Sequence, residues 1–193
     1  VLIFDEVITG FGRLGALTAA EALGVTPDLL TCAKGLTNGA VPMGAVAVRD
    51  DIYRAVIDGA SGPGIEFFHG YTYSGHPLAA AAGLATLDVY QSDGLFQRTT
   101  ELIPYWQDAV HSLKGVRHII DIRDLGLVAG IELEPRPGAP STRATEVFHK
   151  AFDDGFLVRA TADVIALSPP LIISRNQIDE LIDRLSSIMK SVA

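Results

Sequence analysis

The sequence has 193 residues, 48% of them hydrophobic and 20% charged, so it is long enough for one large globular domain or two small ones. Its 15 basic and 23 acidic residues give a net charge of −8, which argues against binding to nucleic-acid phosphates or anionic lipid. The single cysteine, Cys32, cannot form an internal disulfide or a zinc-binding cluster, and we expect a cytoplasmic protein with no metal site. No signal peptide or membrane-spanning run is recognisable.

The first ten residues read VLIFDEVITG, in which four apolar residues precede two acids. A continuous apolar run is typical of a strand that is covered on both faces, as in parallel sheets. Acids at the carboxyl end of such a strand lie where open α/β sheets bind ligands. Asp5 or Glu6 could hold Mg²⁺ beside a nucleotide, or Asp5 could face a cationic group of an organic cofactor. Because the chain opens with Val inside this strand, we expect it to be the C-terminal part of a longer protein.

The next segments alternate short apolar runs with loops rich in Gly, Pro and Thr. We expect helices at residues 16–23 and 50–57 and strands at 29–33 and 44–48, an alternation that predicts an α/β architecture. A further helix is predicted at 76–91, with Pro77 in its first turn. Its small, uncharged side chains predict burial nearly all round.

From about Ser92 the pattern changes to that of a small α+β domain. We expect helices at 95–113 and 145–154, and strands at 118–124, 127–133, 156–158 and 164–167. Ser174 followed by Gln177 is a capping box, which predicts the start of a final helix. The apolar positions of that helix recur at helical spacing: Ile178, Leu181, Ile182, Leu185, Ile188, Met189 and Val192.

Lys34 helps to choose between the two chemistries at the first strand. It follows the apolar run LLTCA, where desolvation would lower its pKa and leave the neutral amine that attacks a carbonyl. A lysine bound to pyridoxal phosphate (PLP) is accompanied by an acid that keeps the pyridine nitrogen protonated, and Asp5 supplies one. The two are 34 − 5 = 29 residues apart, about one strand-crossover-strand unit. No GxxxxGK[ST] motif is present, although a P-loop preceding this sequence would keep a Mg-nucleotide site open.

Three long motifs carry a family resemblance: FDEVITGFGR with Asp5, PDLLTCAKGLTNGAVPMGAV with Lys34, and HGYTYSGHPLAAAAGLA. Together with LVRATADVIALSPPLII near the end, they resemble the class III aminotransferases, which are PLP enzymes of fold type I. The closest branch is that of the ω-amino-acid:pyruvate (β-alanine:pyruvate) aminotransferases. The resemblance implies an α/β fold in which residues 1–91 form the C-terminal part of the PLP-binding large domain, with a mainly parallel sheet. Residues 92–193 would form the small α+β domain.

The resemblance also implies roles for five residues. Asp5 pairs with the pyridinium nitrogen, Lys34 forms the Schiff base, and Val7 packs on one face of the cofactor ring. Thr72 donates a hydrogen bond to the cofactor phosphate of the other subunit, so the family implies a homodimer, or a dimer of dimers, with its active site at the subunit interface. Arg159 binds the carboxylate of a keto acid and swings away for an amine that lacks one. His69 and His76 are expected to orient the loop that carries Thr72.

Some positions depart from the family pattern, and other functions remain open. Ile8 stands where many relatives carry Gln, and Ala162 stands where Gly is usual. The segment VIALSPP lacks the fixed arginine of some relatives, which favours the ω-amino-acid branch, but Arg159 could instead simply pair with Asp163. An aminomutase or decarboxylase of the same fold would share Asp5 and Lys34. A truncated, inactive domain is a further alternative.

Overall fold

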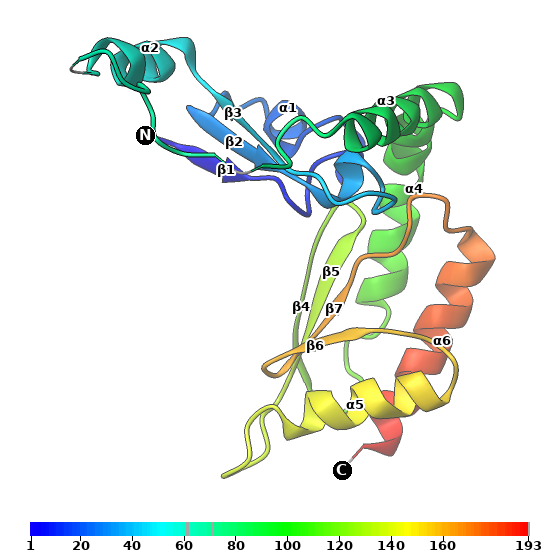
Figure 1. Ribbon diagram of the computed structural model, residues 1–193. Coiled ribbons are helices and arrows are strands. Elements are labelled where there is room, and N and C mark those ends of the chain that lie inside the picture. The colour runs from blue at the N-terminus through cyan, green and yellow to red at the C-terminus, as the bar shows by residue number, and fades with distance from the viewer. Residues whose placement is uncertain (61, 71, 193) are drawn as a thin grey trace. The chain divides into compact units, whose positions relative to one another are not determined.

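The computed structural model describes residues 1–60, 62–70 and 72–192, and it divides into two compact units, Val1–Gln97 and Arg98–Ala193 (Figure 1). No helix in these described ranges has the length and apolar character needed to cross a membrane.

The first unit is an α/β unit built on a three-stranded sheet (Figure 1). Strand β1 runs parallel to β2, and β3 pairs with β2 in the antiparallel direction, giving the order β1-β2-β3. Helices lie between and after the strands as the sequence predicts, so the α/β fold class is confirmed. The elements are β1 (Ile3–Asp5), α1 (Ala19–Leu23), β2 (Leu29–Cys32), the 3₁₀ turn η1 (Lys34–Leu36), β3 (Ala45–Val48), α2 (Asp50–Asp58) and α3 (Pro77–Ser92).

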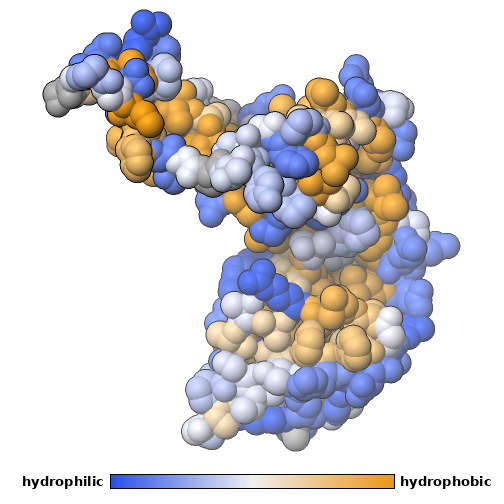
Figure 2. Space-filling view, in the orientation of Figure 1, coloured by the Kyte–Doolittle hydropathy of each residue, from blue (hydrophilic) through white to orange (hydrophobic). Residues whose placement is uncertain are grey.

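The burial predicted for β1 and α3 in this first unit is wrong, and β3 is exposed as well. Ile3 in β1 is 59% exposed, and all four residues of β3 are exposed. Helix α3 buries Ala79, Gly83 and Tyr90 but leaves Leu78 and Leu84 exposed. Figure 2 shows apolar surface over α2 and α3. The physical reason is that no described part of the chain covers these apolar faces, although the elements themselves form where the sequence predicts them.

The second unit is an α+β unit with a four-stranded antiparallel sheet in the order β4-β5-β7-β6. The sequence predicts a strand at residues 156–158, but β6 begins at Arg159, because strand pairing is set by the hairpin with β7 and not by the apolar run. The elements are α4 (Leu95–His111), which begins just before this unit, β4 (Ile119–Leu125), β5 (Val128–Leu133), α5 (Thr142–Asp153), β6 (Arg159–Thr161), β7 (Val164–Leu167) and α6 (Arg175–Ser191).

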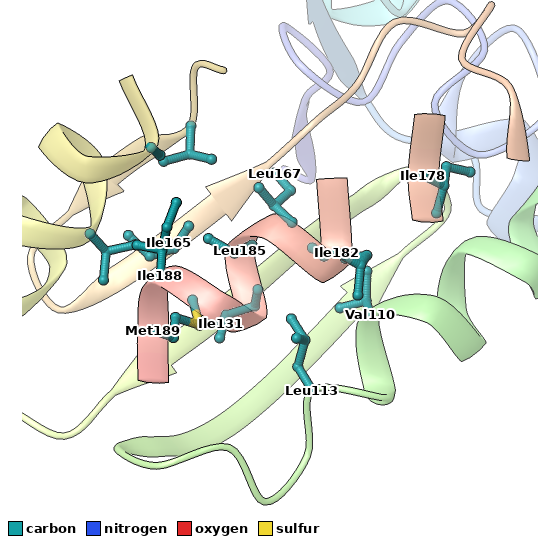
Figure 3. Close-up of a cluster of buried hydrophobic side chains, with 14 of the residues drawn as sticks. Val110, Leu113, Ile131, Ile165, Leu167, Ile178, Ile182, Leu185, Ile188 and Met189 are labelled. Atoms are coloured by element: carbon teal, nitrogen blue, oxygen red, sulfur yellow. The ribbon is translucent and has the colours of Figure 1, made fainter. Parts of the chain in front are cut away.

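One continuous apolar core holds the second unit together. Figure 3 shows side chains of α4, β5, β7 and α6 pointing toward one another, and these include Val110, Ile131, Ile165 and Leu185, all fully buried. The predicted capping box is confirmed: the Gln177 N–H donates to the Ser174 hydroxyl, and the Ser174 N–H donates to the Gln177 side chain. Truncating a core residue such as Leu185 to Ala costs about 2–5 kcal/mol in similar cores, so α6 is firmly fixed against the sheet.

Candidate functional site

Asp5 lies at the carboxyl end of β1, where the parallel register sets it beside Thr31 of β2. Its Oδ1 atom accepts hydrogen bonds from the Val7 N–H at 3.1 Å and from the Thr31 hydroxyl at 3.3 Å. Its other oxygen, Oδ2, has no partner among the described residues. The carboxylate is therefore oriented by the protein through one oxygen, while the second oxygen is available to a donor from outside the chain.

The neighbouring acid, Glu6, is buried and has a structural role. Its side chain is 1% exposed, and its carboxylate accepts hydrogen bonds from the Ala19 N–H at 2.7 Å and the Ala20 N–H at 2.8 Å. The Thr9 hydroxyl donates a third bond at 3.0 Å. The first two donors are the free N–H groups at the start of α1, so Glu6 caps that helix. With its oxygens occupied in this way, Glu6 is not available to hold Mg²⁺.

Lys34 opens the 3₁₀ turn that follows β2. Since β1 and β2 are parallel neighbours, Asp5 and Lys34 lie at the same edge of one sheet, as the sequence predicts from their spacing. Lys34 has φ +43°, in the left-handed region that residues other than glycine rarely adopt. Its side chain is exposed and has no ion-pair partner among the described residues, so this chain does not itself supply the predicted desolvation.

The structure places two further predicted residues in the first unit. Val7 lies two residues after the end of β1 and is half-buried, and Ile8 beside it is exposed. Thr72 lies in an exposed turn before α3. His76 follows this turn, and its Nδ1 accepts a hydrogen bond from the Leu78 N–H at 3.2 Å, which caps the start of α3.

Arg159 belongs to the second unit, at the start of β6. It lines a cavity of about 490 Å³ and is the only charged residue among those described around it. The other lining residues are Leu157, Val158, Ala166, Leu167, Ser168, Pro169, Pro170, Ile173, Gln177 and Leu181. Ala166 is the cross-strand partner of Arg159 on β7, and both residues line this cavity.

The alternative pairing of Arg159 with Asp163 is not found in the described part of the chain. Asp163 instead accepts a hydrogen bond from the Ser141 N–H at 2.8 Å, which ties the β6–β7 turn to the start of α5. Ala162, in that turn, has φ +50°. A left-handed conformation explains why glycine suits this position better than alanine.

Two residues that support the site were missed at the sequence level. Thr31 could have been found from the parallel pairing of β1 with β2, which sets it opposite Asp5. Tyr90, in α3, donates a hydrogen bond from its hydroxyl to the Gly35 carbonyl oxygen, beside Lys34, at 2.7 Å. No sequence signal identifies this contact, because the two residues are 55 positions apart.

The arrangement suits PLP chemically. The free Oδ2 of Asp5 can accept a bond from a pyridinium N–H, and the Lys34 amine at the same sheet edge can condense with an aldehyde. A hydroxyl such as that of exposed Thr72, near a helix N-terminus, suits a phosphate. The described residues thus offer the acid, the amine and one hydroxyl donor that such a cofactor requires.

Comparison with known proteins gives a consistent result. The family model for class-III aminotransferases matches residues 1–189. The chain is 62% identical over its whole length to an omega-aminotransferase of Caulobacter vibrioides and 45% identical to a beta-alanine--pyruvate aminotransferase of Pseudomonas aeruginosa. It spans less than half of these relatives, 44% and 43% of their lengths. A solved (S)-enantioselective omega-transaminase from Thermomicrobium roseum matches 99% of the chain, at 34% identity and a TM-score of 0.89, over 43% of its own length.

Proposed function

Since this chain belongs to the class-III aminotransferase family, we propose that it is part of a PLP-dependent transaminase that moves an amino group from an ω-amino acid or amine, such as β-alanine, to a keto acid such as pyruvate. The observation that carries the proposal is the placement of Asp5 and Lys34 at one edge of a parallel strand pair. The similar proteins named as acting on β-alanine or other ω-amino acids and pyruvate support this choice of substrates.

Asp5 holds the cofactor ring in the proposed site. When bound, PLP supplies an electron sink that stabilises negative charge at the substrate carbon next to the nitrogen. The Oδ2 atom of Asp5 would accept the hydrogen bond of the pyridinium N–H and keep that proton in place. The bonds from Val7 N–H and Thr31 to Oδ1 fix the carboxylate, so its free oxygen is already oriented before the cofactor arrives. Val7 packs against one face of the ring.

Lys34 would hold the cofactor through its side-chain amine. Its Nζ atom would also serve as the general acid–base that takes the proton from the donor carbon. Its place in a short turn directly after a strand gives it a fixed starting point for this transfer.

Arg159 is proposed to select the acceptor. Its guanidinium can bind a carboxylate through two parallel hydrogen bonds, and no ion pair in the described structure competes for it. The surrounding cavity is mainly apolar, so it can take the hydrocarbon part of an amine that has no carboxylate. This combination suits an enzyme that must bind a keto acid and an amine in turn.

The chain is proposed to act as part of a dimer. Thr72 would donate to the cofactor phosphate of the partner subunit, which requires the exposed turn before α3 to lie at a subunit interface. We assign residues 1–91 to the PLP-binding large domain and residues 92–193 to the small domain. The separation of the fold into units that divide between Gln97 and Arg98 supports a boundary near this point.

An absorbance spectrum tests the proposal, and the protein to use is the full-length enzyme that contains this chain. Added PLP should give a band at the edge of the visible region that fades with β-alanine and returns with pyruvate. The band should be absent in Lys34→Ala and present in Lys114→Ala, a change at an exposed lysine of the second unit. A band that persists in Lys34→Ala would overturn the assignment of Lys34. Turnover of β-alanine without any keto acid would instead identify an aminomutase or a decarboxylase.

A further inference from the structure

The turn that carries Lys34 holds this residue in an unfavourable backbone conformation. Lys34 itself has φ +43°, which costs free energy in a residue with a side chain. Within the turn, the N–H groups of Thr37 and Gly39 reach the Lys34 carbonyl oxygen only at 3.3 and 3.2 Å. No side chain caps the start of the turn at Ala33. Such a conformation persists only where surrounding structure fixes it.

Tyr90 supplies a contact from outside the turn. Its hydroxyl donates a hydrogen bond of 2.7 Å to the carbonyl oxygen of Gly35, the residue directly after Lys34. Tyr90 lies near the end of α3 and is 8% exposed. Burial raises the pKa of the phenol by more than the nearby Arg13 guanidinium lowers it, so the hydroxyl keeps the proton that it donates. Its length is ordinary for an O–H···O bond, whereas the two bonds that the Lys34 carbonyl oxygen accepts lie at or beyond the long end of the N–H···O range.

Aromatic packing fixes the direction of that hydroxyl. The Tyr90 ring stacks on Phe11, with centroids 6.2 Å apart, and meets Phe96 at 5.2 Å. Phe11 also presses against Gly35: a Cβ atom added to Gly35 would lie 2.8 Å from the Phe11 Cβ. The backbone of Gly35 is therefore held from one side by Phe11 and tied to α3 by Tyr90.

We propose that Tyr90 is a positioning residue that fixes the Lys34 turn through its hydrogen bond to Gly35, so that the Lys34 amine is presented to the cofactor in one orientation. This inference rests on the proposed role of Lys34 as the cofactor lysine. Tyr90 acts only through the backbone of the turn and does not itself touch substrate or cofactor.

The test replaces Tyr90 with Phe in the full-length enzyme. Phe keeps the ring packed against Phe11 and Phe96 and removes only the hydroxyl. The matched control is Tyr105→Phe, which removes a phenol hydroxyl bonded to Asp179 at 2.5 Å in the second unit. For each variant we would measure hydrogen exchange of residues 33–41 without added cofactor, the pH titration of the absorbance band of PLP joined to Lys34, and kcat and KM for β-alanine.

We expect Tyr90→Phe to speed hydrogen exchange in residues 33–41 by about two- to tenfold. This is the change in the opening equilibrium that corresponds to the net free energy of one hydrogen bond. The midpoint of the band titration should move, and kcat should fall by a similar factor while KM stays within about twofold. Tyr105→Phe should change none of these. Faster exchange with an unchanged titration and kcat would overturn the positioning role and leave Tyr90 a merely structural residue. Unchanged exchange would also overturn it. If the wild type itself lacks a Lys34-dependent band, the proposed function fails instead, and the exchange data still report on the Tyr90 bond.

Discussion

Glu6→Gln probes the buried carboxylate that caps α1. The wild-type carboxylate accepts bonds from the N–H groups of Ala19 and Ala20 and from the Thr9 hydroxyl. A glutamine at this position has one acceptor oxygen and one donor NH₂ group. In its best orientation the glutamine oxygen accepts hydrogen bonds from the Ala19 N–H and the Thr9 hydroxyl. The glutamine NH₂ group then faces the Ala20 N–H, so two buried donors lie next to each other without an acceptor.

The expected cost follows from these contacts. Leaving the buried Ala20 N–H without an acceptor costs about 1–3 kcal/mol, and this range already includes the lost hydrogen bond. Glutamine also avoids burying a charge, which offsets part of this loss. We therefore expect the local free energy of unfolding of α1 to fall by about 2 kcal/mol, a change of roughly thirtyfold in the opening equilibrium.

Native-state hydrogen exchange, resolved to residues 17–24, is the suitable assay because it reads the opening of this segment directly. The control is Glu21→Gln in the same helix, where an exposed carboxylate accepts one bond from the Leu17 N–H at 3.1 Å. Its expected cost is below about 1 kcal/mol, because the glutamine oxygen can still accept the bond from the Leu17 N–H and the exposed NH₂ group can bond to water. Equal effects of the two substitutions, or no effect of Glu6→Gln, would refute the assignment of Glu6 as a buried cap.

Two further predictions concern the second unit. Ala162→Gly should raise the thermal unfolding midpoint, because the left-handed conformation of Ala162 at φ +50° costs about 1–2 kcal/mol that glycine does not pay. The greater flexibility of glycine in the unfolded chain offsets part of this gain. A lower midpoint would show that Ala162 is not strained. The hydrogen bond from His118, and then the charge of Arg143, hold the pKa of Glu134 below its ordinary value of 4.5. A carboxylate whose pKa is lower in the folded state than in the unfolded state stabilises the fold at a pH above its unfolded-state pKa. That stabilisation is lost as the pH falls through the folded-state pKa, so Glu134→Gln should destabilise the protein more at pH 7 than at pH 3 in thermal melts. Equal destabilisation at the two pH values would count against the depressed pKa of Glu134.

The elements of the fold could be predicted from local patterns, whereas their burial could not. The strand at β1 and the capping box at Ser174 depend on nearby residues, which the sequence displays directly. The exposure of Ile3 depends on what covers the sheet, and no described residue covers it. The start of β6 at Arg159 depends on pairing across the hairpin with β7, which the apolar run at 156–158 does not reveal.

The same distinction between local patterns and long-range contacts applies to the candidate site. Asp5 and Lys34 were proposed from a strand end, a turn and their spacing together with the family resemblance, and the parallel pairing of β1 with β2 sets them at one edge. Tyr90 was not identified, because an aromatic residue near the end of an apolar helix has no feature that marks its hydroxyl as bonded to Gly35. Contacts between distant segments require the packing of α3 on the turn, which no local pattern encodes.

The pair Asp5-Glu6 explains why two acids follow one strand. Successive side chains of an extended backbone point to opposite sides, so two adjacent carboxylates at a strand end cannot share one environment. Glu6 turns inward, where three donors surround it and the start of α1 is fixed next to the sheet. Asp5 turns outward and keeps one oxygen free. The buried acid therefore holds the segment that follows the strand in place, and this in turn fixes the strand end from which the exposed acid projects.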